Sequence, residues 1–367
     1  LHSYLVNWLG EKTAGGTDIY GYLQGEDNRR HVVGKVSLDF LPYSIHSIAV
    51  AGNVLSIFVG SIGLEFMSTA MTLCISCSVK DQMATKPATV YVFDLLAAYK
   101  VLDSKEAANM KPLAQIEIDP AAPGVKPTFL FHHINARSFI AESSGNGGHS
   151  MLQLDVCAYE STDGFLGKHV LGDLDDIRSP EVRDSMASGC TAVRRLLLDI
   201  TTHKLVSMLD LPLRDIEGNT YTTELASVRP DLWGKEACFM YSMAYHYAGS
   251  QRMEDMGILK TDLCAAATAA AAAQSSDNGS RANGGATAVA TVTAAFHEDN
   301  VYVGEPLFVA NPEGVDEDDG VVLVVSKDAI AQKTRLLILD AKTLVKVASV
   351  TSTFATMFEF HGQFFAD

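Results

Sequence analysis

RLLILDAKTLVKVAS (Arg335–Ser349) contains an apolar run that ends in Asp340, a short turn, and a lysine that leads into a second strand-like run. Two more segments share this pattern, RRLLLDITTHKLVSM around Asp199 and VYVFDLLAAYKVL around Asp94. A recurring unit of strand, turn and strand is typical of the antiparallel hairpins in the blades of a β-propeller. The sequence therefore predicts an all-β fold, with residues 1–367 in a single β-propeller domain.

Composition indicates a folded chain and excludes one class of partner. The 367 residues are 47% hydrophobic, which is enough to bury a substantial core. The chain carries 28 basic and 44 acidic residues, and this net charge of -16 would repel phosphate backbones, so we predict no nucleic-acid partner. One segment departs from this composition: residues 265–288 are alanine-rich and then Ser/Asn/Gly-rich, which predicts a low-complexity loop insertion.

The six cysteines are few and scattered, which favours a reducing compartment over a disulfide-stapled secreted domain. Cys74 and Cys77 form a CxxC pair, but no second ligand pair at zinc-site spacing accompanies it. The acidic turn DEDDG (Asp316–Gly320) lacks the spaced ligands of a calcium-binding EF-hand loop. We therefore predict a solvated turn there and no function for the CxxC pair.

The 18 residues from Ser47 to Leu64 carry no charge and reach the minimum length of a membrane-spanning helix. Their serines, glycines and β-branched residues favour buried strands instead. The following segment, 63–78, contains Phe66 and Met67 and is a candidate for peripheral contact with a membrane surface.

Three of the eleven histidines stand inside short apolar runs: His46 in PYSIHSIAV, His132 in FLFHHINA and His361 in FEFHGQFF. An unpaired imidazole is costly to bury, so each of them requires a partner. One alternative is a histidine that is only hydrogen-bonded in the core. The other is that strands of a propeller bring the three together at its axis, where imidazoles suit iron, copper, zinc or nickel.

A metal-bound imidazole usually donates its second N–H to a carboxylate or a carbonyl. Glu224 in YTTELASV and Glu305 in VYVGEPLFVA are carboxylates embedded in strand-like sequence. They are the candidates for this supporting role.

These segments resemble the carotenoid cleavage oxygenase family, which includes the retinal pigment epithelial membrane protein, over nearly the whole chain. The block GEPLFVANPEGVDEDDGVVLVV, followed by LLILDAKTL and FHGQFF, carries the most specific part of the likeness. The resemblance implies a seven-bladed β-propeller with an axial Fe(2+) held by four histidines. It makes His46, His132 and His361 the second, third and fourth metal-binding and catalytic ligands.

The resemblance also implies roles for the two glutamates, with Glu224 supporting His132 and Glu305 supporting His361. The family's first histidine precedes the stretch that resembles NWLGEKTAGGTDIYGYLQ, and His2 is a poor substitute for it. We therefore expect this chain to be the C-terminal part of a longer protein, N-terminally truncated here. A second departure is Ser138, where the family usually has a glutamate.

The function implied is that of an Fe(II)-dependent dioxygenase that cleaves a conjugated C=C bond of a carotenoid or apocarotenoid with O2 to give aldehyde or ketone products. The partners implied are that substrate, O2 and a membrane surface. Two alternatives stay open, a retinyl-ester isomerase and a non-catalytic carotenoid-binding protein. The compartment stays open too, with plastid and cytoplasm as intracellular alternatives for a peripheral membrane protein.

Overall fold

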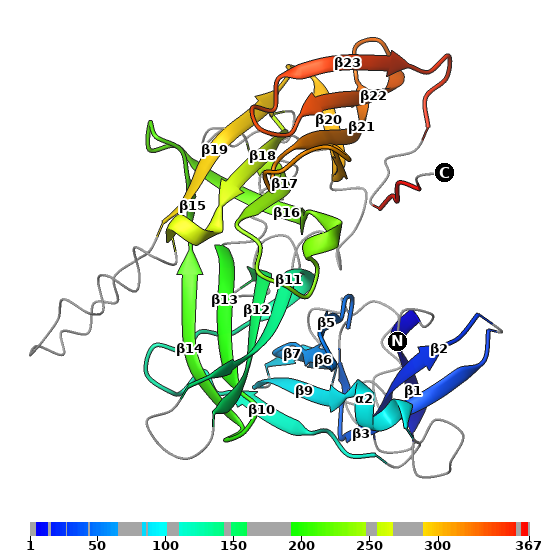
Figure 1. Cartoon of the computed structure of the whole chain (residues 1–367), viewed down its shortest axis with the longest axis vertical. Helices are drawn as coiled ribbons and strands as arrows, with labels where there is room; N and C mark the ends of the chain where they lie inside the picture. The colour runs from blue at the N-terminus through cyan, green and yellow to red at the C-terminus, as the bar shows by residue number, and fades with distance from the viewer. Residues whose placement is uncertain are drawn as a thin grey trace, which may run out of the picture. The chain divides into compact units, whose positions relative to one another are not determined.

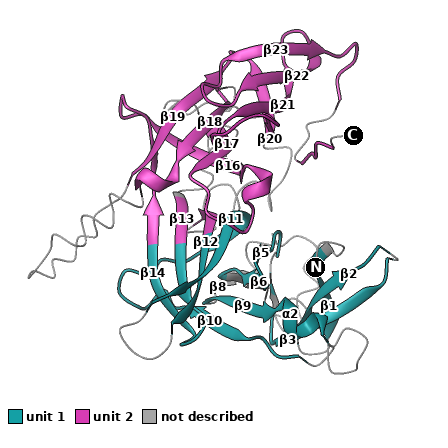
Figure 2. Cartoon of the chain, in the orientation of Figure 1, with its two compact units in different colours: residues 1–154, 196–208 teal, residues 155–195, 209–367 magenta. Residues whose placement is uncertain are grey.

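The structure is a computed structural model that describes residues 5–13, 16–26, 28–42, 45–64, 83–85, 87–100, 110–142, 148–159, 192–246, 255–266, 289–356 and 361–365. It consists of β-strands with very short helical segments (Figure 1). The all-β prediction is confirmed. The chain divides into two compact units, of which unit 1 is residues 1–154 and 196–208 and unit 2 is residues 155–195 and 209–367 (Figure 2). The prediction of a single domain stays a prediction.

Unit 1 contains three antiparallel sheets with the strand orders β1-β2-β3, β10-β9-β6-β5 and β4-β7-β8. Their strands are β1 (Leu5–Thr13), β2 (Gly16–Gln24), β3 (Arg30–Leu38), β4 (Leu41–Pro42), β5 (Ala49–Ala51), β6 (Val54–Val59), β7 (Ile62–Leu64), β8 (Met83–Thr85), β9 (Ala88–Asp94) and β10 (Ala114–Ile118). A short helix, α2 (Leu95–Tyr99), follows β9 directly.

A fourth sheet has the order β11-β12-β13-β14, as in one blade of a propeller. Its strands are β11 (Phe129–Ala141), β12 (His149–Tyr159), β13 (Ala192–Asp199) and β14 (Lys204–Leu211). β11 belongs to unit 1, whereas the other three contribute residues to both units.

Unit 2 continues with the closed sheet β15-β16-β17-β18-β19 and the four-stranded sheet β20-β21-β22-β23. Their strands are β15 (Leu213–Arg214), β16 (Thr220–Val228), β17 (Phe239–His246), β18 (Gly257–Asp262), β19 (Ala290–His297), β20 (Val301–Ala310), β21 (Gly320–Asp328), β22 (Lys333–Asp340) and β23 (Lys346–Thr351), and a 3-10 turn, η5, spans Pro230–Leu232.

Alternating apolar residues give the sheets of the two core clusters a buried face, as the period of two along a strand requires. In β21 and β22, Val322 pairs with Leu339 and Val324 with Leu337. All four side chains are fully buried in one core cluster of unit 2. A separate cluster in unit 1 is built in the same way around Leu23, Val33, Leu55 and Phe93.

Two of the three predicted Asp-turn hairpins are confirmed. Asp340 ends β22, and its Oδ1 accepts hydrogen bonds from the Lys342 and Thr343 backbone N–H groups before β23 begins. Asp199 ends β13, and its Oδ1 accepts from Thr202 N before β14 begins.

The third predicted hairpin is wrong in its turn, and the strand predicted after Lys100 begins outside the described residues. Asp94 Oδ1 accepts from the N–H groups of Leu96 and Ala97, at 2.9 Å each, and caps helix α2. The segment LLAAY consists largely of strong helix formers, so the same aspartate cap begins a helical turn there instead of a hairpin.

The uncharged stretch from Ser47 to Leu64 forms β5, β6 and β7, as predicted, and β6 is almost entirely buried. Among the residues that the structure describes, no helix is long and apolar enough to cross a membrane. Most of the proposed membrane-contact segment 63–78, the Cys74–Cys77 pair and nearly all of the 265–288 insertion lie outside the described residues.

Cys238 and Cys264 form a disulfide, which the sequence reading missed. β17 and β18 pair in a register that sets Phe239 opposite Asp262, and the N–H of Leu263 donates to Cys238 O. Because this register places the two cysteines side by side, the disulfide links the residue before β17 to the turn that follows β18.

The acidic turn Asp316–Gly320 is exposed or half-buried, and ion pairs and hydrogen bonds also hold it to neighbouring strands. Lys260 Nζ lies 2.5 Å from Asp318 Oδ2, and Lys342 Nζ lies 2.5 Å from Asp319 Oδ1. The Glu317 carboxylate accepts from the backbone N–H groups of Cys238 and Phe239. The turn therefore anchors the beginning of β17.

Candidate metal centre

Unit 1 brings two of the three candidate histidines together. His132 lies in β11, whereas His46 lies in the segment just before β5. Their rings meet edge to face, with centroids 4.9 Å apart and an interplanar angle of 88°. One ring nitrogen of His46 lies within 4.8 Å of one ring nitrogen of His132. A shared metal ion can span this separation.

Besides His132, the aromatic ring of Phe131 packs against the His46 ring. Phe131 packs edge-on against His46 with ring centroids 5.3 Å apart, and it packs against the buried Phe129 in the same manner at 5.1 Å. A Cβ at Gly60 would lie only 2.9 Å from the Phe129 ring, so a glycine is required where β6 ends.

His133, the neighbour of His132, points to different partners, as alternation along a strand requires. Its ring packs near Phe58, and its Nδ1 shares a 2.7 Å hydrogen bond with Ser47 Oγ. Burial, and to a lesser degree the nearby His132, lower the pKa of His133 from 6.5 to about 3. His133 is therefore neutral at physiological pH.

Unit 2 joins His361 to its predicted carboxylate partner. Glu305 in β20 accepts from the backbone N–H of Gly362 at 3.0 Å, and its Oε1 lies 3.3 Å from His361 Nδ1. An imidazole that donates its Nδ1 proton to this carboxylate keeps the Nε2 lone pair available for a metal.

Glu224 is a buried carboxylate in β16 of unit 2, with 3% of its surface exposed. It accepts from Tyr159 Oη at 2.7 Å and from the Leu225 N–H at 2.8 Å. Leu225 has a positive φ of 49°. His132 belongs to unit 1, so the assignment of Glu224 to His132 stays a prediction.

Both glutamates lie at irregularities in their sheets. The β16–β17 register shifts between Glu224 and Ser227, and the β20–β21 register shifts between Val303 and Pro306. A β-bulge re-aims a side chain out of its normal alternation, which suits a carboxylate that must face one particular partner. Pro306 and Gly304 are sequence signals of such a bulge, because proline cannot donate to a sheet ladder and glycine within a strand often marks a bulge.

The expectation that all three histidines lie in strands is correct for His132 alone. His46 and His361 are exposed and lie outside strands, while His132 is half-buried. Hydrogen bonds from side chains hold these two segments instead of backbone pairing in a sheet. Ser47 makes such a bond beside His46, and Glu305 makes one beside His361. His46 and His132 belong to unit 1 and His361 to unit 2, so the complete ligand set stays a prediction.

The chemistry of the donor set fits a divalent transition metal. Neutral imidazoles are good ligands for iron, copper, zinc and nickel, and a carboxylate behind an imidazole strengthens it as a ligand. The His46–His132 ring pair supplies two such donors, and the His361–Glu305 pair supplies the carboxylate-backed third.

We expect Glu305→Gln to lower the affinity for the metal by about 10 to 100-fold, because the amide is a weaker acceptor for the imidazole N–H. Titration of the apoprotein with Co(II) measures this. Glu313→Gln, in an exposed turn, is the matched control and should leave the affinity unchanged. Equal affinities for Glu305→Gln and the unchanged chain would contradict the role of Glu305.

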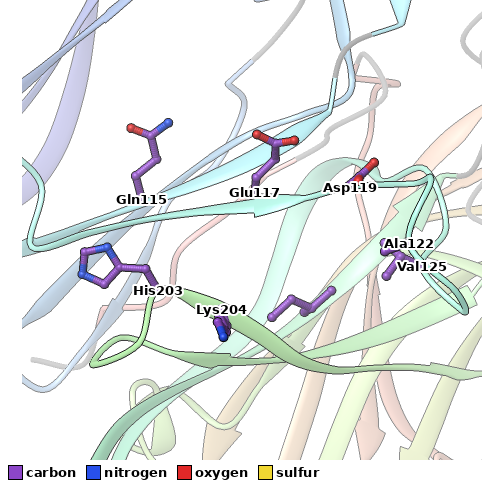
Figure 3. Close-up of a pocket in the computed structure, with 8 residues that line it drawn as sticks. Gln115, Glu117, Asp119, Ala122, Val125, His203 and Lys204 are labelled. Carbon is purple, nitrogen blue, oxygen red and sulfur yellow. The ribbon is translucent and has the colours of Figure 1, made fainter.

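A groove of about 430 Å³ in unit 1 has none of these histidines in its lining (Figure 3). Gln115 and Glu117 line it from β10, Asp119 follows that strand, and His203 and Lys204 line it at the start of β14. Ala122, Val125 and Leu205 add apolar surface to the same groove.

Comparisons with known proteins identify the family of the chain. The family model of the retinal pigment epithelial membrane protein matches residues 9–366. Carotenoid cleavage dioxygenase 8 of Arabidopsis thaliana chloroplasts is 21% identical over 347 residues, 93% of this chain and 50% of that protein. Human beta,beta-carotene 15,15'-dioxygenase is 40% identical over 73 residues, 20% of this chain and 13% of that protein. The chain thus spans at most about half the length of these curated relatives.

Solved structures of Synechocystis apocarotenoid oxygenase share the fold. A variant of that enzyme matches with a TM-score of 0.62 and 18% identity, covering 98% of this chain and 60% of that one. The cobalt-substituted form matches with a TM-score of 0.61 and the same identity and coverage. The structural neighbours are seven-bladed β-propellers, which confirms the predicted fold class. With a family model that matches almost its entire length, this chain belongs to the carotenoid oxygenase family of the retinal pigment epithelial membrane protein.

Proposed function

We propose that this protein is an Fe(II)-dependent oxygenase that cleaves a conjugated C=C bond of a carotenoid or apocarotenoid with O2 and releases aldehyde or ketone products. The observation that carries the proposal is the His46–His132 ring pair, which supplies two imidazole nitrogens within 4.8 Å of each other in a chain of this family. The names of the relatives support the reaction class, since the plant and human proteins are both carotenoid dioxygenases.

In this proposal His46, His132 and His361 hold the iron through ring nitrogens. Bound iron supplies the activation of O2. Glu305 fixes the orientation of the His361 ring by accepting its Nδ1 proton at 3.3 Å, and the Gly362 N–H holds the other carboxylate oxygen. The histidines remain neutral donors, and the carboxylate moderates the positive charge from outside the ligand shell.

Glu224 serves the same purpose for His132 in this proposal. Tyr159 Oη and the Leu225 N–H each donate to one of its carboxylate oxygens. Each oxygen has a second lone pair, so the carboxylate can accept an imidazole N–H without losing either bond. Because the Glu224 carboxylate is buried, a hydrogen bond to it is stronger than the same bond would be in water.

The substrate class implies a route from a membrane, because a polyene is almost insoluble in water. We propose that segment 63–78, which includes Met71 and Leu73, provides the apolar contact at an intracellular membrane of the plastid or the cytoplasm. Vesicle flotation of the unchanged chain and of a Phe66→Ser/Met67→Ser variant tests this, and equal flotation would contradict it.

The reaction is tested with the complete reading frame, loaded with Fe(II) and given an all-trans apocarotenal under air. The proposal predicts O2 uptake in step with the appearance of two carbonyl products, and loss of both on His132→Ala. A parallel reaction receives a retinyl ester, and its isomerisation without O2 uptake would contradict the proposal in favour of an isomerase. Stoichiometric binding of the pigment without turnover would contradict it in favour of a binding protein.

A further inference from the structure

The segment that carries His46 is joined to the strand that carries His132 by side chains. β5 pairs with β6, and β11 belongs to a different sheet (Figure 1). Residues 45–48 lie outside any strand. No backbone ladder within the described residues therefore sets the position of His46 relative to His132.

Ser47 makes the connection with a single hydroxyl. Its Oγ accepts the backbone N–H of His133 at 3.0 Å and shares a 2.7 Å hydrogen bond with the His133 Nδ1. Ser47 directly follows His46, and His133 directly follows His132. One oxygen atom therefore joins the residues that adjoin the two candidate ligands.

A second serine holds the same two segments farther along. Ser138 Oγ in β11 donates to the backbone oxygen of Ala51, the last residue of β5, at 3.0 Å. The chain turns there at Gly52, whose φ of +59° suits glycine, and a Cβ at Gly52 would lie 3.1 Å from Ser138 Oγ. Together Ser47 and Ser138 hold the segment at two points along β11.

We propose that Ser47 is a positioning residue of the metal centre: through His133 it fixes the distance and the angle between the rings of His46 and His132. A metal ion requires donor nitrogens held within about 0.5 Å of their working positions. Loss of the hydroxyl leaves the His133 backbone N–H without this acceptor, removes the hydrogen-bond partner of the His133 Nδ1, and releases the His46 segment. Ser138 supports the same alignment with one bond instead of two.

This inference rests on the proposed function, because it requires that His46 and His132 bind a metal. Its test therefore measures metal binding directly, with Co(II), whose visible absorption reports both affinity and ligand geometry. The key comparison is Ser47→Thr against Ser47→Val, since the two side chains have the same shape and only threonine retains the hydroxyl. Ser47→Ala completes the set.

Ser37→Ala is the matched control, because Ser37 Oγ donates to Asp18 across two strands of the same unit, away from the histidines. We expect about a tenfold loss of Co(II) affinity and a changed Co(II) spectrum for Ser47→Ala and Ser47→Val. Ser47→Thr should restore both, and Ser37→Ala should alter neither. Thermal melting of each variant separates loss of fold from loss of alignment.

Unchanged affinity and spectrum in Ser47→Val would overturn the inference while leaving the proposed function intact, as would equal losses in Ser47→Thr and Ser47→Val. If the unchanged chain binds no Co(II), the proposed function fails and the inference fails with it. If the Ser47 variants do not fold, Ser138→Ala decides: a fewfold loss of affinity is expected, and no loss overturns the inference.

Discussion

His132→Ala is expected to lower the affinity for Fe(II) by more than about 100-fold, because a lost ligand costs at least as much as a lost supporting carboxylate. His132 is the one candidate ligand that lies in a strand. The centroid of its ring lies 4.9 Å from the centroid of the His46 ring. Removing the His132 ring also leaves His46 without that contact. Iron content after anaerobic loading and desalting measures the effect.

The matched control for this prediction is His203→Asn. His203 is an exposed histidine of a turn with a φ of 57°, a conformation that asparagine tolerates. The control should keep the iron content of the unchanged chain. Iron content in His132→Ala equal to that of the control would show that His132 is only a packed histidine of the core.

Asp210→Asn is expected to lower the free energy of unfolding by about 3 to 5 kcal/mol, because it removes the carboxylate charge that faces the buried Arg194 guanidinium. Arg194 is fully buried in β13, and its Nε and Nη2 donate to the two carboxylate oxygens of Asp210 in β14 at 2.6 and 3.1 Å. Urea denaturation of the two proteins measures the difference.

Asp231→Asn is the control for burial. The Arg229 Nε lies 2.6 Å from Asp231 Oδ1, the same distance as in the buried pair, but the Asp231 side chain is 60% exposed. Exposed pairs contribute roughly 0 to 1 kcal/mol, so the control should change stability little. Equal losses in Asp210→Asn and Asp231→Asn would refute the argument from burial.

The sequence predicted the hairpins because their signal is local. An aspartate at the end of a strand accepts N–H groups two or three residues later, and this occurs at Asp199 and Asp340. Asp94 makes the same kind of bonds and yet begins a helix. The aspartate therefore marks where the strand ends, while the residues that follow decide what comes next.

The site was less predictable because its parts depend on distant partners. The pattern around His132 identifies a strand, but nothing near His46 indicates that Ser47 will bond to a residue 86 positions away. The register shifts at Glu224 and Glu305 arise from the pairing of whole strands. The Cys238–Cys264 disulfide was missed for the same reason, since it depends on the β17–β18 register.

The proposal that His46, His132 and His361 bind one iron is tested most directly by X-ray absorption spectroscopy. The Fe(II)-loaded chain is measured beside its His46→Ala, His132→Ala and His361→Ala variants. The account predicts one iron per chain with the multiple-scattering signature of at least three imidazoles, and one imidazole fewer in every variant that retains metal. An oxygen-only shell, or a shell that is the same in all four proteins, would contradict it.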